Sequence, residues 1–228
     1  MPRKPLIRSL YEFPMTGDEI EAKSFETIDS EAQGSGFSSG QWAVVRRLVH
    51  ASADFNLIDQ IRFSENAISA GMKALRSGSK IYVDSKMILS GLSMARLKRV
   101  SPDYGAERLM CHVSDPDVVT LSKETGLPRS LHAVRKSAQQ LHGSIAVFGN
   151  APVALMELNR MMIEDGVLPA LVIGMPVGFV HVVESKLELM SLGADFIAIE
   201  GRRGGSPLAV ATVHALCELA VAPPKEPD

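Results

Sequence analysis

The sequence has few of the residues that mark several large classes of protein. It holds two cysteines and one tryptophan, and aromatic residues make up 5% of the chain. So few cysteines argue against a disulfide scaffold or a cysteine-rich metal centre. We therefore expect buried, unpaired Cys111 and Cys217 in a reducing compartment, the cytoplasm. The formal net charge of −2 lacks the basic excess of nucleic-acid-binding domains, so no nucleic-acid partner is expected.

Long uninterrupted apolar runs are also missing. The most apolar window, residues 169–183, is broken by Gly174, Pro176 and Gly178 and is shorter than a bilayer requires. The basic first residues have no apolar segment behind them, so they do not resemble a secretory signal. We therefore expect no membrane partner.

The composition that remains is that of an ordinary soluble globular protein. Hydrophobic residues make up 46% and charged residues 22% of the 228 residues, which is enough for one large α/β domain. We expect a single domain over residues 1–228. Prolines and scattered charge predict an extended lead-in at residues 1–15, and a polar, proline-rich end predicts a frayed tail at residues 222–228.

The pattern of elements indicates the fold class. Helical patterns at residues 16–32, 41–55 and 64–76 form a preface, and cap residues such as Thr16 and Ser38 begin two of them. Short apolar runs that predict strands then begin near residues 80, 108, 144, 170 and 195, with helical patterns between them, including one at 129–141. This alternation predicts a three-layer α/β/α fold with a mostly parallel, Rossmann-like sheet of about five strands.

Two loops should fall on one edge of this sheet, because parallel strands place all their strand-to-helix loops at the carboxyl end. The NAP loop (residues 149–152) offers Asn150 as a helix N-cap and leaves backbone N–H groups facing a crevice, unless it only begins a helix. The MPVG loop (residues 174–179) predicts either close contact with a flat, largely apolar ligand or a tight packing turn.

Charged residues near strand ends and helix starts suggest anion binding. The arginine loop (residues 201–205) carries Arg202 and Arg203 at the start of the last helix, and Arg129 begins another helix. Cations are unfavourable at helix N-termini, so we interpret these arginines as carboxylate or phosphate clamps rather than as solvated charges. Asp84 follows the first strand, either as a functional carboxylate or as a helix N-cap.

A histidine on the second predicted helix is the candidate proton carrier. Arg46, His50 and Asp54 are spaced four residues apart, and Arg47 lies three residues before the histidine, so all can share one helix face. An aspartate one turn away would favour the imidazolium form. The alternative is a surface helix with ordinary charge pairs.

Taken together, several short segments resemble the precorrin-8X methylmutase family, also called precorrin isomerase, which includes cobalt-precorrin-8 enzymes. They are Ser24, RLVH at 47–50, Asp84 with Met87 and Gly91, PRS at 128–130, GNAP at 149–152, GMPVGF at 174–179 with ESK at 184–186, and GRRGGS at 201–206. The resemblance covers residues 16–220, and the two Pro-containing loops at their spacing are its most specific part.

This resemblance implies an isomerase of cobalamin biosynthesis. A methyl group would move from carbon 11 to carbon 12 of ring C of precorrin-8X or cobalt-precorrin-8, giving hydrogenobyrinate or its cobalt form without net redox change. It also implies a corrinoid substrate, no separate cofactor or metal site, and a homodimer with active sites near the subunit interface. Whether the substrate carries cobalt stays open.

The family's functional residues map onto positions of this chain. His50 matches the catalytic histidine, which would protonate a ring C nitrogen and later take the proton back. Ser24, Arg47 and Arg129 match residues that contact substrate. To these we add, from their positions alone, Asp84, Asn150 and Arg202.

Two positions depart from expectation. Family members often have threonine after Asn-Ala-Pro, where this chain has Val153, which removes a hydroxyl group. The sequence does not explain why a lysine, Lys86, lies near the end of the first strand.

Two other functions compete with the isomerase. A corrinoid carrier without turnover would need the same loops and arginines but not the proton chemistry of His50. A nucleotide-dependent oxidoreductase is suggested only by the sheet pattern, and the chain lacks a G-x-G-x-x-G after the first strand.

Overall fold

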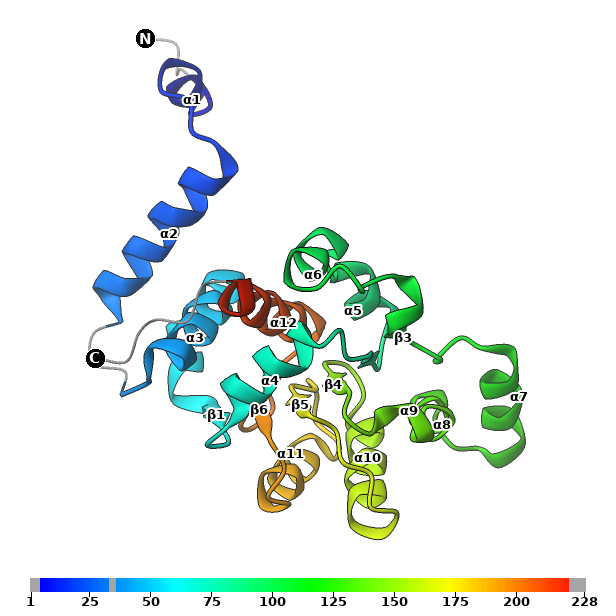
Figure 1. Ribbon diagram of the computed structural model, residues 1–228. Coiled ribbons are helices and arrows are strands. Elements are labelled where there is room, and N and C mark those ends of the chain that lie inside the picture. Colours follow the sequence, from blue (N-terminus) through cyan, green and yellow to red (C-terminus); the bar gives the residue numbers. More distant parts are fainter. Residues whose placement is uncertain (1–4, 33–35, 222–228) are drawn as a thin grey trace.

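The computed structural model describes residues 5–32 and 36–221, and the tail predicted at 222–228 lies outside them. A six-stranded sheet lies between two layers of helices (Figure 1), which confirms the three-layer α/β/α fold. The strands, in the order β1-β6-β5-β4-β2-β3, are β1 (Ile61–Phe63), β2 (Ile81–Val83), β3 (Leu109–Met110), β4 (Ile145–Phe148), β5 (Leu171–Gly174) and β6 (Phe196–Ile199). All neighbouring pairs are parallel except β1 and β6.

The strand β1 is missing from the sequence prediction. It has only three residues, too few for a periodic signal, and it pairs antiparallel with β6 through Ile61 and Ile199. Because the two strands run in opposite directions, the 3₁₀ helix η1 (Phe55–Gln60) before β1 lies at the carboxyl end of β6. There the N–H of Glu200 donates to the carbonyl oxygen of Gln60 at 2.7 Å.

Side chains alternate between two cores, one on each face of the sheet. Ile145 and Val147 of β4 belong to the first core, and Ala146 and Phe148 to the second. The first face is covered by α3 (Ser39–Ser52), α4 (Ala67–Arg76), α5 (Lys86–Gly91), α6 (Met94–Val100) and α12 (Ser206–Val221). The second is covered by α8 (Arg129–Lys136), α9 (Ala138–Leu141), α10 (Pro152–Glu164) and α11 (Val182–Ser191), with α7 (Pro116–Thr125) packed on α8.

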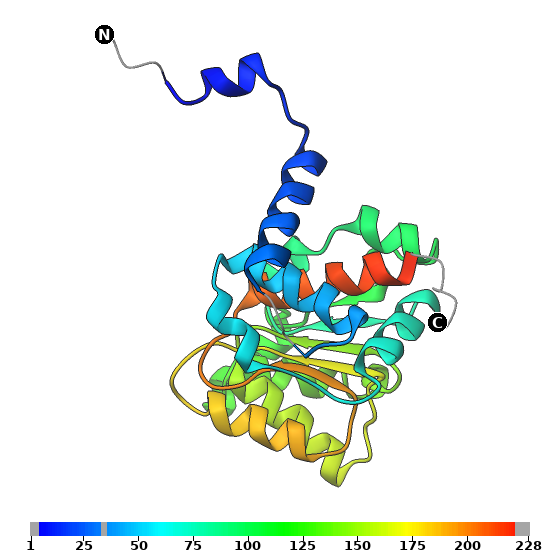
Figure 2. The same cartoon turned by 90° about the vertical axis from the view of Figure 1, so that its left-hand side faces the viewer.

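Figure 2 shows the sheet nearly edge-on, with α3 and α12 on one side and α10 and α11 on the other. The helix α12 is the centre of the first layer, since it packs against α3, α4, α5 and α6. None of the helices within residues 5–32 and 36–221 is long and apolar enough to cross a membrane.

Two predicted helix starts are confirmed in detail. Thr16 caps α2 (Gly17–Glu31) in a capping box with Glu19, and Ser38 caps α3 in one with Gln41. The single helix expected at 129–141 is instead divided into α8 and α9 at Ser137, whose hydroxyl donates to a carbonyl one turn back in α8.

The N-terminal segment forms an arm rather than an extended lead-in. A helix, α1 (Arg8–Glu12), occupies part of the stretch predicted to be extended, because Pro5 and Pro14 flank this helix and do not interrupt it. Figure 2 shows α1 and α2 leaving the body of the molecule. No residue of α1 is buried, and α2 buries only Ile28.

Candidate active site

Three loops meet at the carboxyl edge of the sheet: the NAP and MPVG loops, which the sequence predicts there, and the arginine loop. Backbone hydrogen bonds join them: the N–H of Met175 donates to Phe148 at the end of β4, and the N–H of Gly205 donates to Met175, both at 2.8 Å. The N–H of Gly178 also donates to the carbonyl of Arg202 at 3.3 Å. The MPVG loop is therefore hydrogen-bonded on one side to the end of β4, which leads into the NAP loop, and on the other side to the arginine loop.

Asp84 holds the NAP loop through hydrogen bonds to its backbone. Its carboxylate is buried, with 1% of the residue exposed, and accepts the backbone N–H groups of Gly149, Asn150 and Ala151 at 3.2, 2.8 and 2.7 Å. Burial raises the pKa of Asp84, and the three N–H groups oppose that rise by stabilising the charged form. The alternative N-cap role is wrong, because Ser85 caps α5.

Asn150 sits in the same loop with its side chain exposed at the carboxyl edge. The expectation that it caps α10 is wrong, since the N-cap position is occupied by Ala151, which makes no side-chain cap. The side chain of Asn150 therefore extends from a loop whose backbone is fixed by Asp84.

The MPVG loop has one buried and one exposed apolar end. Met175 is fully buried, whereas Val177, Phe179 and the following Val180 are 46%, 84% and 70% exposed. The Arg202 guanidinium lies over the Phe179 ring, 5.5 Å from its centroid. The loop thus serves as a packing turn at its start and presents apolar surface beside a cation at its end.

Arg203 connects this edge to the end of α3. Its Nη1 lies 3.0 Å from Oδ2 of Asp54, whose other oxygen accepts the N–H of Asn56 at 3.0 Å. Asp54 is therefore not behind His50, as the helical spacing predicts. The helix α3 ends at Ser52, and the left-handed conformation of Ala53 turns the chain away from the helix face.

His50 lies on the last turn of α3 and is exposed. Its ring meets Phe25 of α2 edge-on, with centroids 5.3 Å apart and planes at 66°. It lines a hollow of about 380 Å³ together with Ser24, Thr27, Ile28, Glu31, Val49, Ala53 and Phe55. The structure therefore brings the predicted catalytic histidine and the predicted Ser24 together.

The Arg47 guanidinium lies over the same Phe25 ring, 5.2 Å from its centroid, and lines a neighbouring hollow. Its Nη2 is 2.8 Å from a carboxylate oxygen of Glu21, and its side chain is 13% exposed. The hydrogen bond from Arg47 lowers the pKa of the Glu21 carboxyl group. The guanidinium is thus already paired in the single chain.

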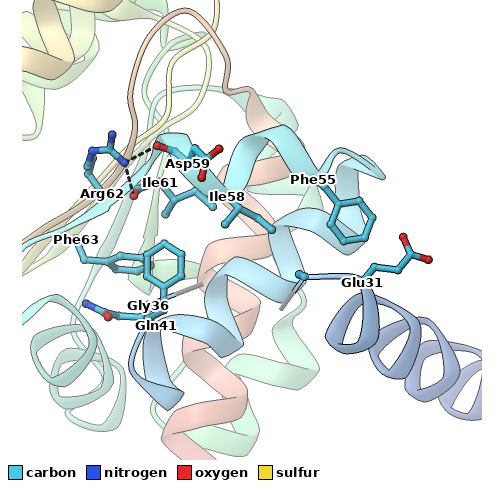
Figure 3. Close-up of a pocket in the computed structure, with 11 residues that line it drawn as sticks. Glu31, Gly36, Gln41, Phe55, Ile58, Asp59, Ile61, Arg62 and Phe63 are labelled. Carbon is cyan, nitrogen blue, oxygen red and sulfur yellow. Dashed lines mark hydrogen bonds between the residues drawn. The ribbon is translucent and has the colours of Figure 1, made fainter. Parts of the chain in front are cut away.

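A larger hollow of about 760 Å³ adjoins the one at His50 and shares Glu31 and Phe55 with it (Figure 3). Phe63 lines it, and Arg62 in its wall donates to the carbonyls of Asp59 and Ile61. Because no residue predicted for the chemistry lines this hollow, the smaller one at His50 is the candidate site.

Arg129 is not brought to this site within one chain. It begins α8 and is exposed, on the face of the sheet opposite to α3 (Figure 1).

Sequence reasoning missed three residues with clear roles here. Glu21 pairs with Arg47, Phe25 supports the ring of His50, and Lys186 is buried against the arginine loop. In the sequence Lys186 stands out only as part of the ESK motif at 184–186, because its spacing does not indicate which groups it binds. Lys86 now has an account: its Nζ lies 3.5 Å from the carbonyl oxygen of Cys111, beyond the end of β3.

Comparisons with known proteins indicate one family. A family model described as precorrin-8X methylmutase matches residues 19–219. A cobalt-precorrin-8 methylmutase from Leptospira interrogans is 41% identical, covering 88% of this chain and 92% of its own. A precorrin-8X methylmutase from Pseudomonas aeruginosa is 38% identical, covering 88% of this chain and 94% of its own.

The solved structures give the same result. A precorrin-8X methylmutase from Thermus thermophilus superposes with a TM-score of 0.82 at 43% identity, over 90% of this chain and 97% of that one. The match extends across the sheet, both helical layers and the segment that carries His50. The chain therefore belongs to the precorrin-8X methylmutase family, a family of isomerases of cobalamin biosynthesis.

Proposed function

We propose that this chain moves a methyl group from carbon 11 to carbon 12 of ring C of precorrin-8X or cobalt-precorrin-8, giving hydrogenobyrinate or cobyrinate. The observation that carries the proposal is an exposed histidine, His50, in a hollow beside Ser24. The Arg203–Asp54 pair ties this hollow to the loops at the carboxyl edge. Family membership supplies the reaction class.

In the proposed mechanism, His50 acts first as an acid and then as a base. The imidazolium protonates a ring C nitrogen, which makes the conjugated system electron-poor. The bond from carbon 11 to the methyl group then breaks as the bond to carbon 12 forms, and the nitrogen returns its proton to the imidazole. Atoms and electrons balance without an oxidant or reductant, and such proton transfer contributes roughly 10²- to 10⁴-fold in rate.

The surroundings suit a flat macrocycle that carries many carboxylates. Val177, Phe179 and Val180 offer exposed apolar surface at the carboxyl edge. Arg202 lies over the Phe179 ring, so its charge stands next to that surface. We infer that the ring system contacts the apolar side chains while its carboxylates meet guanidinium groups.

The working unit in this proposal is a homodimer. Leu6 and Ile7, just before α1, and Tyr11 within it are 89%, 47% and 72% exposed, and α1 buries no residue within the described chain. In this proposal a second copy that covers this arm also supplies Arg129, which begins a helix on the face of the sheet opposite to the helix of His50. Light scattering tests this: a monomer at working concentration would remove the shared-site part of the proposal.

The cytoplasm remains the predicted location. Both cysteines of the chain, Cys111 and Cys217, are free and buried, as expected for a reducing compartment.

The central test replaces His50 by alanine and follows the visible absorbance of the protein mixed with precorrin-8X or its cobalt form. We expect conversion to fall by about 10² or more, with the binding shift kept. His142→Ala is the matched control, because it removes an exposed histidine just before β4, at the opposite edge of the sheet. Wild-type conversion by H50A would refute the acid–base role, and a wild-type protein that binds without conversion would favour a corrinoid carrier.

A further inference from the structure

A buried lysine holds the arginine loop from inside the protein. Lys186 lies on α11 and is fully buried, with 0% of the residue exposed. Its Nζ donates to the carbonyl oxygens of Gly201 at 3.0 Å and Arg203 at 2.6 Å. No carboxylate pairs with it in the part of the chain that the structure describes. Burial accordingly lowers the pKa of Lys186 to about 8.

A buried lysine lowers the stability of the folded protein unless it makes interactions that an apolar side chain cannot make. Burying an ammonium group without a countercharge is strongly unfavourable, and methionine would fill a similar volume at lower cost. The two carbonyls explain the choice, because both accept hydrogen bonds from the ammonium group, and an apolar side chain would leave them without this donor.

The arginine loop is confined on its other side by the MPVG loop. A Cβ atom on Gly204 would lie 2.2 Å from the carbonyl oxygen of Met175, so the two backbones are in direct contact. The N–H of Gly205 donates to that same carbonyl, and the N–H of Gly178 donates to Arg202. The backbone of the arginine loop is therefore hydrogen-bonded to the MPVG loop on one side and to Lys186 on the other.

One side chain of this loop pairs with the residue that follows Ala53 of the candidate site. Arg202 lies over Phe179, and Arg203 pairs with Asp54, four residues beyond His50. A change in the loop backbone would move both guanidinium groups and release the pair that ties the loop to the end of α3. The contacts thus run without a gap from the buried Lys186 to the segment that follows His50.

We propose that Lys186 is a positioning residue: its ammonium group fixes the backbone of the arginine loop, and thereby the places of Arg202 and Arg203 at the substrate. The catalytic part of this proposal rests on the proposed function. The structural part does not, and it can be measured without substrate.

The experiment compares Lys186→Met with Asn159→Leu. Asn159 is equally buried and donates to the carbonyl of Ser185, next to Lys186 on α11, but does not touch the arginine loop. We expect K186M to raise hydrogen exchange at the amides of residues 201–205 about tenfold while the sheet strands keep their protection. N159L should lower overall stability without this local change.

The kinetic measurement separates positioning from general damage. K186M should raise KM for the corrinoid about tenfold and lower kcat by a smaller factor, since the loop binds substrate and does not carry the proton. In a background with Arg202→Gln and Arg203→Gln, adding K186M should change KM little, because the groups that it positions are gone. N159L should leave KM unchanged in both backgrounds.

Each result decides one part of the proposal. Unchanged loop exchange in K186M would overturn the positioning role, whether or not the protein turns over the corrinoid. Raised exchange with unchanged KM and kcat would overturn the link to the reaction. A wild-type protein without turnover would refute the proposed function and leave the exchange result standing. If K186M does not fold, Lys186→Gln replaces the ammonium group with a shorter, uncharged amide. Wild-type loop exchange in that variant would show that the ammonium group is not required and would equally overturn the proposal.

Discussion

The sheet edge and the α2–α3 pair both border the candidate site, but they hold their charged groups in different ways. At the edge, Asp84 and Lys186 are buried and bind backbone groups of the NAP and arginine loops. Between α2 and α3, Arg46 and Arg47 pair with Asp29 and Glu21 through side chains that are 13–42% exposed.

The difference follows from backbone polarity. The NAP loop turns N–H groups inward and needs an anion, whereas the arginine loop turns carbonyls inward and needs a cation. Breaking a buried charge from its partners costs about 3–5 kcal/mol, whereas an exposed ion pair contributes about 0–1 kcal/mol. The sheet edge should therefore be a preformed surface, and the α2–α3 side, which carries His50 and Ser24, should be the more easily disturbed.

The largest expected effect is that of Asp84→Ala. It removes the acceptor of three buried N–H groups, so the free energy of unfolding should fall by about 3–5 kcal/mol. Urea unfolding measures this, and Asp117→Ala, which breaks an exposed pair with Lys136, is the control. If the two variants were equally stable, the buried Asp84 carboxylate would contribute no more to stability than an exposed ion pair does.

Gly204→Ala should come next. The added Cβ would meet the Met175 carbonyl at 2.2 Å, so we expect a loss of about 2–3 kcal/mol together with raised KM. Gly143→Ala is a matched control, because Gly143 also has a positive φ, of 69°, but open space around its Cβ. It should cost only about 1–2 kcal/mol. A cost for G204A no larger than that for G143A would show that the two loops are not in tight contact.

The helical side should lose stability in mild acid through His214. Burial, with Arg96 and Arg47 nearby, lowers the pKa of His214 from 6.5 to about 4, and its Nε2 accepts the N–H of Ser93. The unfolded chain binds the proton first, so stability is full above pH 6.5 and falls toward pH 4 by about 2 kcal/mol after allowance for partial exposure.

Urea unfolding of wild type and His214→Gln at several pH values checks this. The variant should show a flatter decline between pH 6.5 and 4. An unchanged slope in H214Q would assign the acid sensitivity to other groups.

The smallest effect is expected from Glu21→Gln. The pair with Arg47 is partly exposed, so its loss should cost about 0.5–1 kcal/mol and less at high salt. The lowered pKa of Glu21 means that the contribution is present above pH 4.5 and is lost as the pH falls below it. Thermal unfolding beside Glu26→Gln, an exposed residue of the same helix, measures it. A loss above about 2 kcal/mol would mean that α2 is held as firmly as the sheet edge.

Much of the fold could be predicted from local signals. The capping boxes at Thr16 and Ser38 and the apolar runs of β2, β4, β5 and β6 lie where the sequence places them. These elements are determined within a few residues of chain, by side chains that satisfy nearby backbone groups or alternate with the strand period. The three-residue β1 could not be predicted, because its antiparallel partner, β6, lies more than 130 residues away.

The site shows the same division. By itself the sequence indicated the candidate residues for the chemistry, which are His50, Ser24 and the arginines, through residue type and motif. Only the tertiary structure decided their partners: Asp54 faces Arg203 because Ala53 leaves the helical conformation, and Arg129 lies across the sheet from His50. The buried charges Asp84 and Lys186 belong to this second class. Their roles depend on which way distant loops turn their N–H and carbonyl groups, and that orientation exists only once the loops are packed together.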